Sequence, residues 1–310
     1  VYSDATKGWL PVSDDAVAFD HGNPPTQRAI FGFGNTGSNV SMTNLVTSSG
    51  VVGTDVTGVG TARRSLTASG YGIDKAIFAY GTTGSITNLS NLVNNSGVVA
   101  TDTSGVGTAR QQLNAASYGL DKAIMAYGLA GSIVSISNLV SNSGVVAADV
   151  TGVGTARRLL GAASYGTDKV IFGYGLAASI TAVTNLVTNA GVIGTDVSGV
   201  GSAREGLAAT GYGGDKAIFG YGTTGSRVSI TNLVNNSGVV GSDVTGVGTA
   251  RQNIVAAAYG GDKAIFGYGQ TASKVSMTNL VSNSGVVAAD VTGVGTERTD
   301  LAAAGYSTSA

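Results

Sequence analysis

The sequence predicts an all-β fold, a six-bladed β-propeller made of four-stranded antiparallel blades. Three observations predict it: a 47-residue repeat of constant length, four short strand candidates in every copy, and no stretch with helical periodicity. Units of roughly 40 to 50 residues with four strands are typical of propeller blades, because each small twisted sheet buries its faces only against its neighbours.

The repeat is defined by residue types that recur every 47 positions. A basic residue opens the run "AIF" or a variant of it at Arg28, Lys75, Lys122, Lys169, Lys216 and Lys263. An aspartate recurs at Asp55, Asp102, Asp149, Asp196, Asp243 and Asp290. An arginine recurs at Arg63, Arg110, Arg157, Arg204, Arg251 and Arg298. The copies contain no insertion or deletion, so we expect six equal units.

The four strands of a unit are easiest to follow in the fifth copy. The first is predicted from Arg251 to Tyr259, and the Gly260-Gly261 turn joins it to the second, from Asp262 to Gly269. The third is predicted from Val275 to Val281 and the fourth from Val286 to Val291. Tight glycine turns favour antiparallel hairpins. The alanine-rich first strand belongs near the axis, where only small residues fit.

Large apolar residues recur in the predicted second strand. They are Phe31, Phe78, Met125, Phe172, Phe219 and Phe266. We expect these side chains to fill the gaps between adjacent blades.

The two ends of the chain are expected to complete one blade together. The first copy has no ordinary first strand, whereas Arg298 to Tyr306 reads as a first strand that nothing follows. Pairing this segment with Arg28 to Gly34 would close the ring and remove exposed sheet edges. The predicted domain organisation is therefore a lead-in segment, 1–24, and a propeller, 25–310. The lead-in contains the only histidine, His21, which we expect at the surface.

Composition and charge exclude several classes of partner. Charged residues make up 11% of the chain, with 17 basic and 18 acidic, and no basic run is present. Nothing would therefore hold a phosphate backbone, and we expect no nucleic acid partner. No uninterrupted apolar run approaches the roughly 20 residues of a membrane span, so we expect no membrane insertion.

The sequence contains no recognisable set of catalytic residues. With one histidine and no cysteine, neither a Ser-His-Asp triad nor an ordinary His or Cys metal site can be assembled. The segments Gly32 to Gly37 and Gly220 to Gly225 match a dinucleotide-binding glycine pattern, but that pattern needs a following helix and none is predicted. We therefore expect a non-enzymatic protein with no cofactor.

The repeated aspartates and arginines have two possible roles. Arginines arranged around an axis could bind an anion. A residue present in every blade is more simply explained by a structural role. Asp243 would cap the "DVTGVG" turn that it begins. Arg251 would bond to backbone carbonyls or to an aspartate between blades. The sequence favours the structural role for both sets.

The copies differ from one another in two places. The first is the pair of residues after each repeated arginine, and the second is the loop between the second and third strands. In an up-and-down blade both places lie at the same end, which predicts one variable face. Its charged residues are candidates for contact with a partner: Arg64, Arg158, Glu205, Arg227, Lys274 and Asp300. Neutral drift at solvated positions is the alternative.

The units resemble kelch repeats. The shared features are an arginine that opens the first strand, an aromatic-glycine pair that ends the second, and a long loop before the third. The units read Gly-Tyr-Gly where kelch repeats have a double glycine, and they lack the late tryptophan. The sequence "GVGTAR…LAAAGYGGDKAIFGYG" also looks like the repeats of proteins from tailed bacteriophages, particularly marine ones.

These resemblances imply a non-enzymatic structural or adhesive protein of a bacteriophage virion, in a tail fibre, a tail or a capsid decoration. Its partners would be other virion proteins, a host-surface receptor or a glycan, and its location the virion surface or the extracellular space. The alternative is a secreted, lectin-like propeller in which Tyr221 and its equivalents stack on sugar. The sequence leaves the oligomeric state open.

Overall fold

The computed structural model describes residues 2–4, 8–9 and 27–309. Within these residues the chain is all-β, without a helix, and 18 of its strands form six three-stranded antiparallel sheets. This arrangement is consistent with a repeat protein of the β-propeller kind. The strands β1 (Tyr2–Asp4) and β2 (Gly8–Trp9) form a separate pair. The rest of the predicted lead-in, His21 included, lies outside the described residues.

Each sheet takes one strand from each of three equivalent sets. The first strands are β5 (Thr67–Tyr71), β8 (Asn114–Tyr118), β11 (Gly161–Tyr165), β14 (Ala208–Tyr212), β17 (Val255–Tyr259) and β20 (Ala302–Ser307). The second are β6 (Lys75–Ala79), β9 (Lys122–Ala126), β12 (Lys169–Gly173), β15 (Lys216–Gly220), β18 (Lys263–Gly267) and β3 (Gln27–Asn35). The third are β7 (Ser90–Val93), β10 (Ser137–Val140), β13 (Thr184–Val187), β16 (Thr231–Val234), β19 (Thr278–Val281) and β4 (Asn39–Val46).

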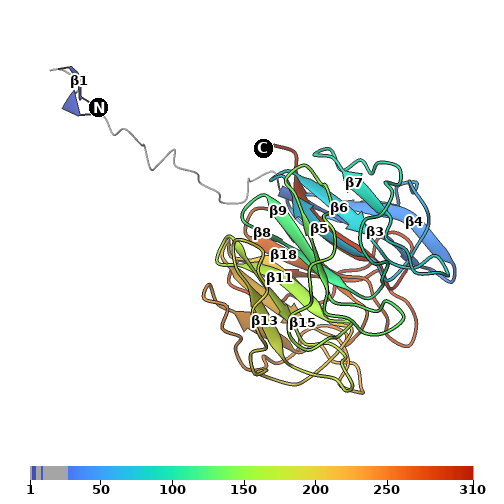
Figure 1. Cartoon of the computed structure of the whole chain (residues 1–310). Helices are drawn as coiled ribbons and strands as arrows, with labels where there is room; N and C mark the ends of the chain where they lie inside the picture. The colour runs from blue at the N-terminus through green and yellow to red at the C-terminus, as the bar shows by residue number, and fades with distance from the viewer. Residues whose placement is uncertain (1, 5–7, 10–26, 310) are drawn as a thin grey trace.

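The two ends of the described chain meet in one sheet, in the order β20-β3-β4. The ladder between β20 and β3 runs from Ala302 opposite Gly32 to Ser307 opposite Gln27. The last strand of the chain thus takes the position of the first strand that the N-terminal copy lacks (Figure 1).

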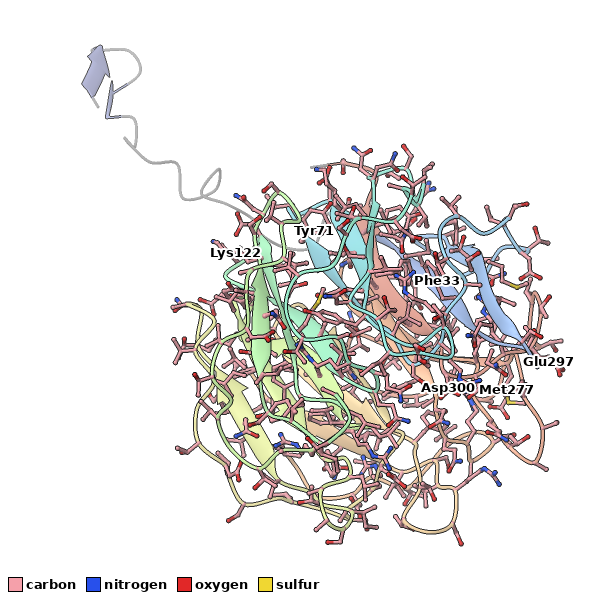
Figure 2. The ribbon with its side chains drawn as sticks, turned by 45° about the vertical axis from the view of Figure 1, so that its right-hand side comes forward. Phe33, Tyr71, Lys122, Met277, Glu297 and Asp300 are labelled. Carbon is pink, nitrogen blue, oxygen red and sulfur yellow. The ribbon has the colours of Figure 1, made fainter. Side chains whose placement is uncertain are left out.

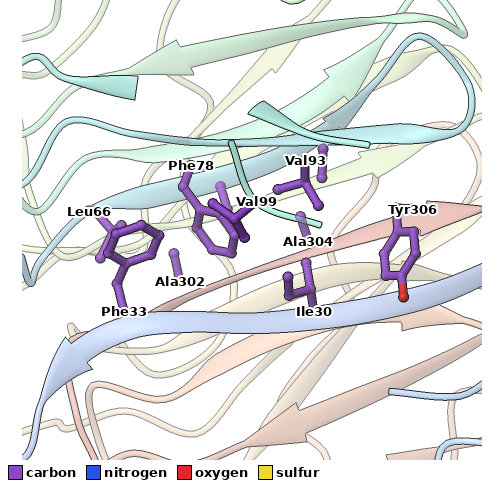
Figure 3. Packing of buried hydrophobic residues seen from close by; sticks show 11 residues of the cluster. Ile30, Phe33, Leu66, Phe78, Val93, Val99, Ala302, Ala304 and Tyr306 are labelled. Carbon is purple, nitrogen blue, oxygen red and sulfur yellow. The ribbon is translucent and has the colours of Figure 1, made fainter. Parts of the chain in front are cut away.

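Neighbouring sheets are held together by apolar clusters. Every first strand contacts the first strand of the next sheet, and β20 contacts both β17 and β5. In the cluster between β20-β3-β4 and β5-β6-β7, the Phe33 and Phe78 rings lie 5.1 Å apart, with Leu66 and Ala302 beside them (Figure 3). Burying a side chain such as Phe78 contributes roughly 1.5 to 3 kcal/mol. The large residues of the second strands therefore pack between sheets, where the sequence places them.

Only three strands of each unit form a continuous ladder, where the sequence predicts four. The fourth segment of the first unit touches β4 through two isolated bridges, Val52 to Val46 and Val56 to Thr43. Between them, the Asn44 side chain donates to the Gly53 carbonyl and to the Asp55 carboxylate. Backbone bonds remain from Gly53 N to the Leu45 carbonyl and between Val56 and Thr43. The Asn44 side chain interrupts the pairing between them, which explains why the predicted fourth strand is not continuous.

The sheets have two distinct ends. At one end the hairpins between first and second strands turn, as at Tyr71 and Lys75. At the other end, which we call the variable face, first strands begin and second strands finish. Figure 2 shows Asp300 and Glu297 on one side of the molecule and Tyr71 and Lys122 on the other. No helix within the described ranges is long and apolar enough to cross a membrane.

Candidate functional site

The repeated arginines are fully buried, and each donates a hydrogen bond to the side-chain oxygen of a repeated asparagine. Arg63 is 0% exposed, and it donates to the Tyr80 carbonyl at 2.9 Å and to Asn91 Oδ1 at 2.7 Å. Its guanidinium lies 4.4 Å over the Phe33 ring of the neighbouring sheet. Burial lowers the pKa of Arg63 to about 10, although the Asp102 charge acts to raise it. The other five repeated arginines are equally buried, so none offers an exposed cation for an anion on the axis.

The repeated aspartates connect successive repeats rather than cap their own turns. Asp243, expected to cap the turn that it begins, instead accepts hydrogen bonds from the backbone N and the Oγ of Ser202, in the preceding repeat. Asn232 donates to the same carboxylate at 2.9 Å. Burial acts to raise the pKa of Asp243, but these bonds and the Arg204 charge together hold it below its ordinary value. The prediction that Asp243 caps its own turn is therefore wrong. The carboxylate binds a segment 41 residues away, which the sequence of the turn alone does not indicate.

The repeated tyrosines are not available to a sugar. Tyr221 is 0% exposed, and its ring lies between the Arg251 guanidinium, at 4.5 Å, and the Phe266 ring, at 5.2 Å. Its hydroxyl donates to the Val247 carbonyl at 3.1 Å. Burial raises the pKa of Tyr221 to about 12. The aromatic platform on which the lectin-like alternative depended is thus part of the core.

The two sets of variable positions lie side by side. Arg64 and Thr82 form an antiparallel bridge, in which each backbone N donates to the carbonyl of the other at 3.0 and 2.8 Å. The equivalent bridges join Gln111 to Leu129, Arg158 to Leu176, Glu205 to Thr223, Gln252 to Gln270 and Thr299 to Asn35. Residues after the repeated arginine therefore border the loop between second and third strands in every unit.

The six charged candidate residues differ in exposure. Arg64 and Arg227 are exposed, whereas Arg158, Glu205, Lys274 and Asp300 are half-buried.

Two groups of these residues are brought together. Glu205 and Arg227 both bridge to Thr223, so they lie on adjacent segments. Burial raises the pKa of the Asp300 carboxyl, while the Arg64 and Lys274 charges act to lower it, which places all three in one electrostatic cluster.

Six of the positions that the sequence identified as variable form a ring at this end, although the ring itself was not predicted. It consists of the second residue of each variable pair, and we call it the axial ring: Ser65, Gln112, Leu159, Gly206, Asn253 and Asp300. All six have positive φ, between 51° and 61°. Backbone N–H groups join successive members, as from Gln112 to the Ser65 carbonyl at 2.8 Å and from Gly206 to the Leu159 carbonyl at 2.9 Å.

The axial ring lines a cavity of about 90 Å³ together with the starts of the first strands. A left-handed conformation costs a non-glycine residue roughly 1 to 2 kcal/mol, least for asparagine and aspartate. Glutamine and leucine occupy it here at Gln112 and Leu159. The signal in the sequence was the excess of residues that tolerate this conformation at the position, namely Gly206, Asn253 and Asp300.

The cavity combines the mostly polar axial ring with an apolar wall, formed by Leu66, Leu113, Leu160, Leu207, Ile254 and Leu301. Its ring offers one carboxylate, two amides and one hydroxyl, beside the apolar Leu159. Across residues 27–309 no group of three or more potential metal-ligating side chains comes together.

Comparison of the chain with known protein families and with curated proteins gave no match.

Proposed function

We propose that the chain is a six-bladed propeller closed by its C-terminal strand, and that it acts as a non-enzymatic binding scaffold. Closure is supported by the ladder between β20 and β3 and by the cluster that joins β17 and β18 to β3. Together with the other interfaces, these contacts give each sheet two neighbours, which is the arrangement that a closed ring requires.

One observation carries the binding role: the shared and the variable residues occupy different places. The repeated arginines, aspartates and tyrosines are bonded to one another or buried between sheets, so they serve folding. The variable pair after each repeated arginine and the variable loop between second and third strands border each other at one end. In a repeat scaffold, function resides where the copies differ, because the shared positions are needed for packing.

We place this scaffold on a bacteriophage virion, exposed at its surface, with a host-surface receptor or a neighbouring virion protein as its partner. The sequence of the repeats supports this location through its resemblance to repeat proteins of tailed bacteriophages. The alternative is a secreted carbohydrate-binding protein. It can no longer rely on stacking of sugar on Tyr221 and its equivalents, because these rings are buried. The polar axial cavity nevertheless favours carbohydrate as the ligand in either setting.

The location and the binding face are tested in two steps. An antibody against the chain is used to label virus particles purified from the source of the sequence, and labelling is expected on the particle surface. Recovery of the chain only as free protein would refute the virion assignment.

The second step measures binding of the purified chain to host cells of the labelled particles. One variant removes three positive charges from the variable face: Arg64→Gln, Arg227→Gln and Lys274→Gln. The control removes three at the hairpin end, where each lysine is 43% to 45% exposed: Lys122→Gln, Lys169→Gln and Lys216→Gln. We expect the first variant to bind at least tenfold more weakly and the control to bind normally. Equal behaviour of the two would refute the assignment of the face.

A further inference from the structure

We propose that the axial ring and its cavity bind one neutral, polyhydroxylated sugar residue, at the end of a surface glycan. The inference rests on the proposed function, because it takes the variable face to be the binding face. It adds a defined site, a ligand class and the side chains that would hold the ligand.

The strained backbone of the ring is the first argument. Another position with positive φ is uniform in the repeat: it holds Phe33 in the first unit and tyrosine in the others, as at Tyr221, because the aromatic ring packs between sheets. The axial ring has no such common packing role, since its six members are six different residue types. Gly206 shows that the backbone needs no side chain there. The repeated backbone fixes the conformation of the ring, and packing leaves the side chains undetermined, so they are available to a ligand.

Unused hydrogen-bonding groups are the second argument. Arg158 donates to Gln112 Oε1 at 2.7 Å, which leaves the amide nitrogen of Gln112 to donate elsewhere. Within the described part of the chain, the side chains of Ser65, Asn253 and Asp300 make no hydrogen bond. A hydroxyl group both donates and accepts, so neighbouring hydroxyls of a sugar match this mixture of amides, hydroxyl and carboxylate. Leu159 would contact the C–H face of the sugar ring.

The charges at the cavity select a neutral ligand. Asp300 is the one charged residue that lines it, so an anion would be repelled. Arg64 and Lys274 act on the same carboxylate from outside the lining and would oppose a bound cation. Neither sign of charge is therefore favoured, whereas hydroxyl groups are.

The size of the cavity fits one sugar end. By the measure in which one water needs roughly 10 to 15 Å³, a cavity of about 90 Å³ holds about six to nine water-sized groups. This is somewhat less than a whole pyranose with its substituents. We therefore expect the sugar to enter in part, with the linkage to the rest of the glycan left outside the cavity.

The test uses the full chain on an array of immobilised glycans, followed by saturation-transfer NMR with the free methyl glycosides of the sugars found. Asp300→Asn keeps the shape and tolerates positive φ, and we expect it to weaken binding at least tenfold. The double variant Ser65→Gln and Gly206→Gln fills the cavity with the residue already present at Gln112, and we expect it to abolish binding. Asp262→Asn is the control, since it makes the same chemical change as Asp300→Asn at the hairpin end, where the Asp262 side chain is 39% exposed.

Every outcome decides for or against the site, provided that thermal melting shows the variants folded. Failure of the wild-type chain to bind any glycan or methyl glycoside would overturn it, and so would undiminished binding by the filled variant. Equal loss in Asp262→Asn would place the sugar outside the cavity and also overturn it. If glycan binding follows these expectations but removal of the face charges leaves cell binding unchanged, the site stands and the proposed partner face fails.

Discussion

The buried arginines provide the sharpest test of how the sheets are held together. Replacing Arg63 by methionine keeps an apolar stem of similar length but removes three donors, to the carbonyls of Tyr80 and Thr61 and to Asn91 Oδ1. It also removes the cation from the face of the Phe33 ring, 4.4 Å away. Breaking a buried charge pair typically costs about 3 to 5 kcal/mol. Because the Asp102 side chain is 26% exposed and can be solvated, we expect about 3 kcal/mol.

The matched control is the next residue in the chain. Arg64 is exposed, and Arg64→Met should change the unfolding free energy by no more than about 0.5 kcal/mol. Both variants are measured by urea denaturation, followed by circular dichroism and by tyrosine fluorescence, so that partial unfolding of single sheets is detected. A loss below about 1 kcal/mol for Arg63→Met, or an equal loss in both variants, would contradict the assigned role.

Three further predictions concern pH, the cavity and closure. Burial acts to raise the pKa of Asp102, but its hydrogen bonds and the Arg63 charge lower it overall. The stabilisation from this carboxylate should be complete above about pH 4, the pKa in the unfolded chain, and should be lost as the pH falls through the folded pKa. Urea denaturation at a series of pH values should show a smaller acid loss in Asp102→Asn than in the wild-type chain. The pKa of Asp300 is raised by burial, so Asp300→Asn should raise the unfolding free energy at pH 7 by less than about 1 kcal/mol. The gain should shrink in acid, where the wild-type carboxyl becomes neutral, and a loss of stability at pH 7 would contradict this prediction. Deleting Ala302–Ser307 leaves one edge of β3 unpaired and should give aggregates on size-exclusion chromatography, whereas a soluble chain with unchanged circular dichroism would count against closure.

The sequence predicts most of the fold because its dominant signal is periodic. Six copies of equal length determine the number of sheets, and the glycine turns determine the hairpins. The fourth strand was overestimated for a definite reason: the sequence "VVGTDV" has strand propensity, but the Asn44 side chain bonds to Gly53 and Asp55 where a ladder would run. Propensity alone does not show that a neighbouring side chain will compete for the same backbone.

The candidate site could be predicted only in part. Differences between copies identified the variable face, because they require nothing but counting. The residues of the axial ring were among the variable positions, but their positive φ and the cavity that they line were missed. The repeated backbone imposes that conformation on any residue type, as Gln112 and Leu159 demonstrate. The partner of Asp243 was missed because it lies in the preceding repeat.

The repeated arginines and the axial ring are neighbours in the sequence but have different roles. Arg157 is fully buried and bonded to Asn185, whereas Leu159, two residues later, is held in the axial ring mainly by its own backbone. The ring's backbone bonds run between units and do not involve side chains, so its side chains can differ without disturbing the sheets. This arrangement allows the axial position to accept different side chains, while the buried arginine two residues earlier stays fixed.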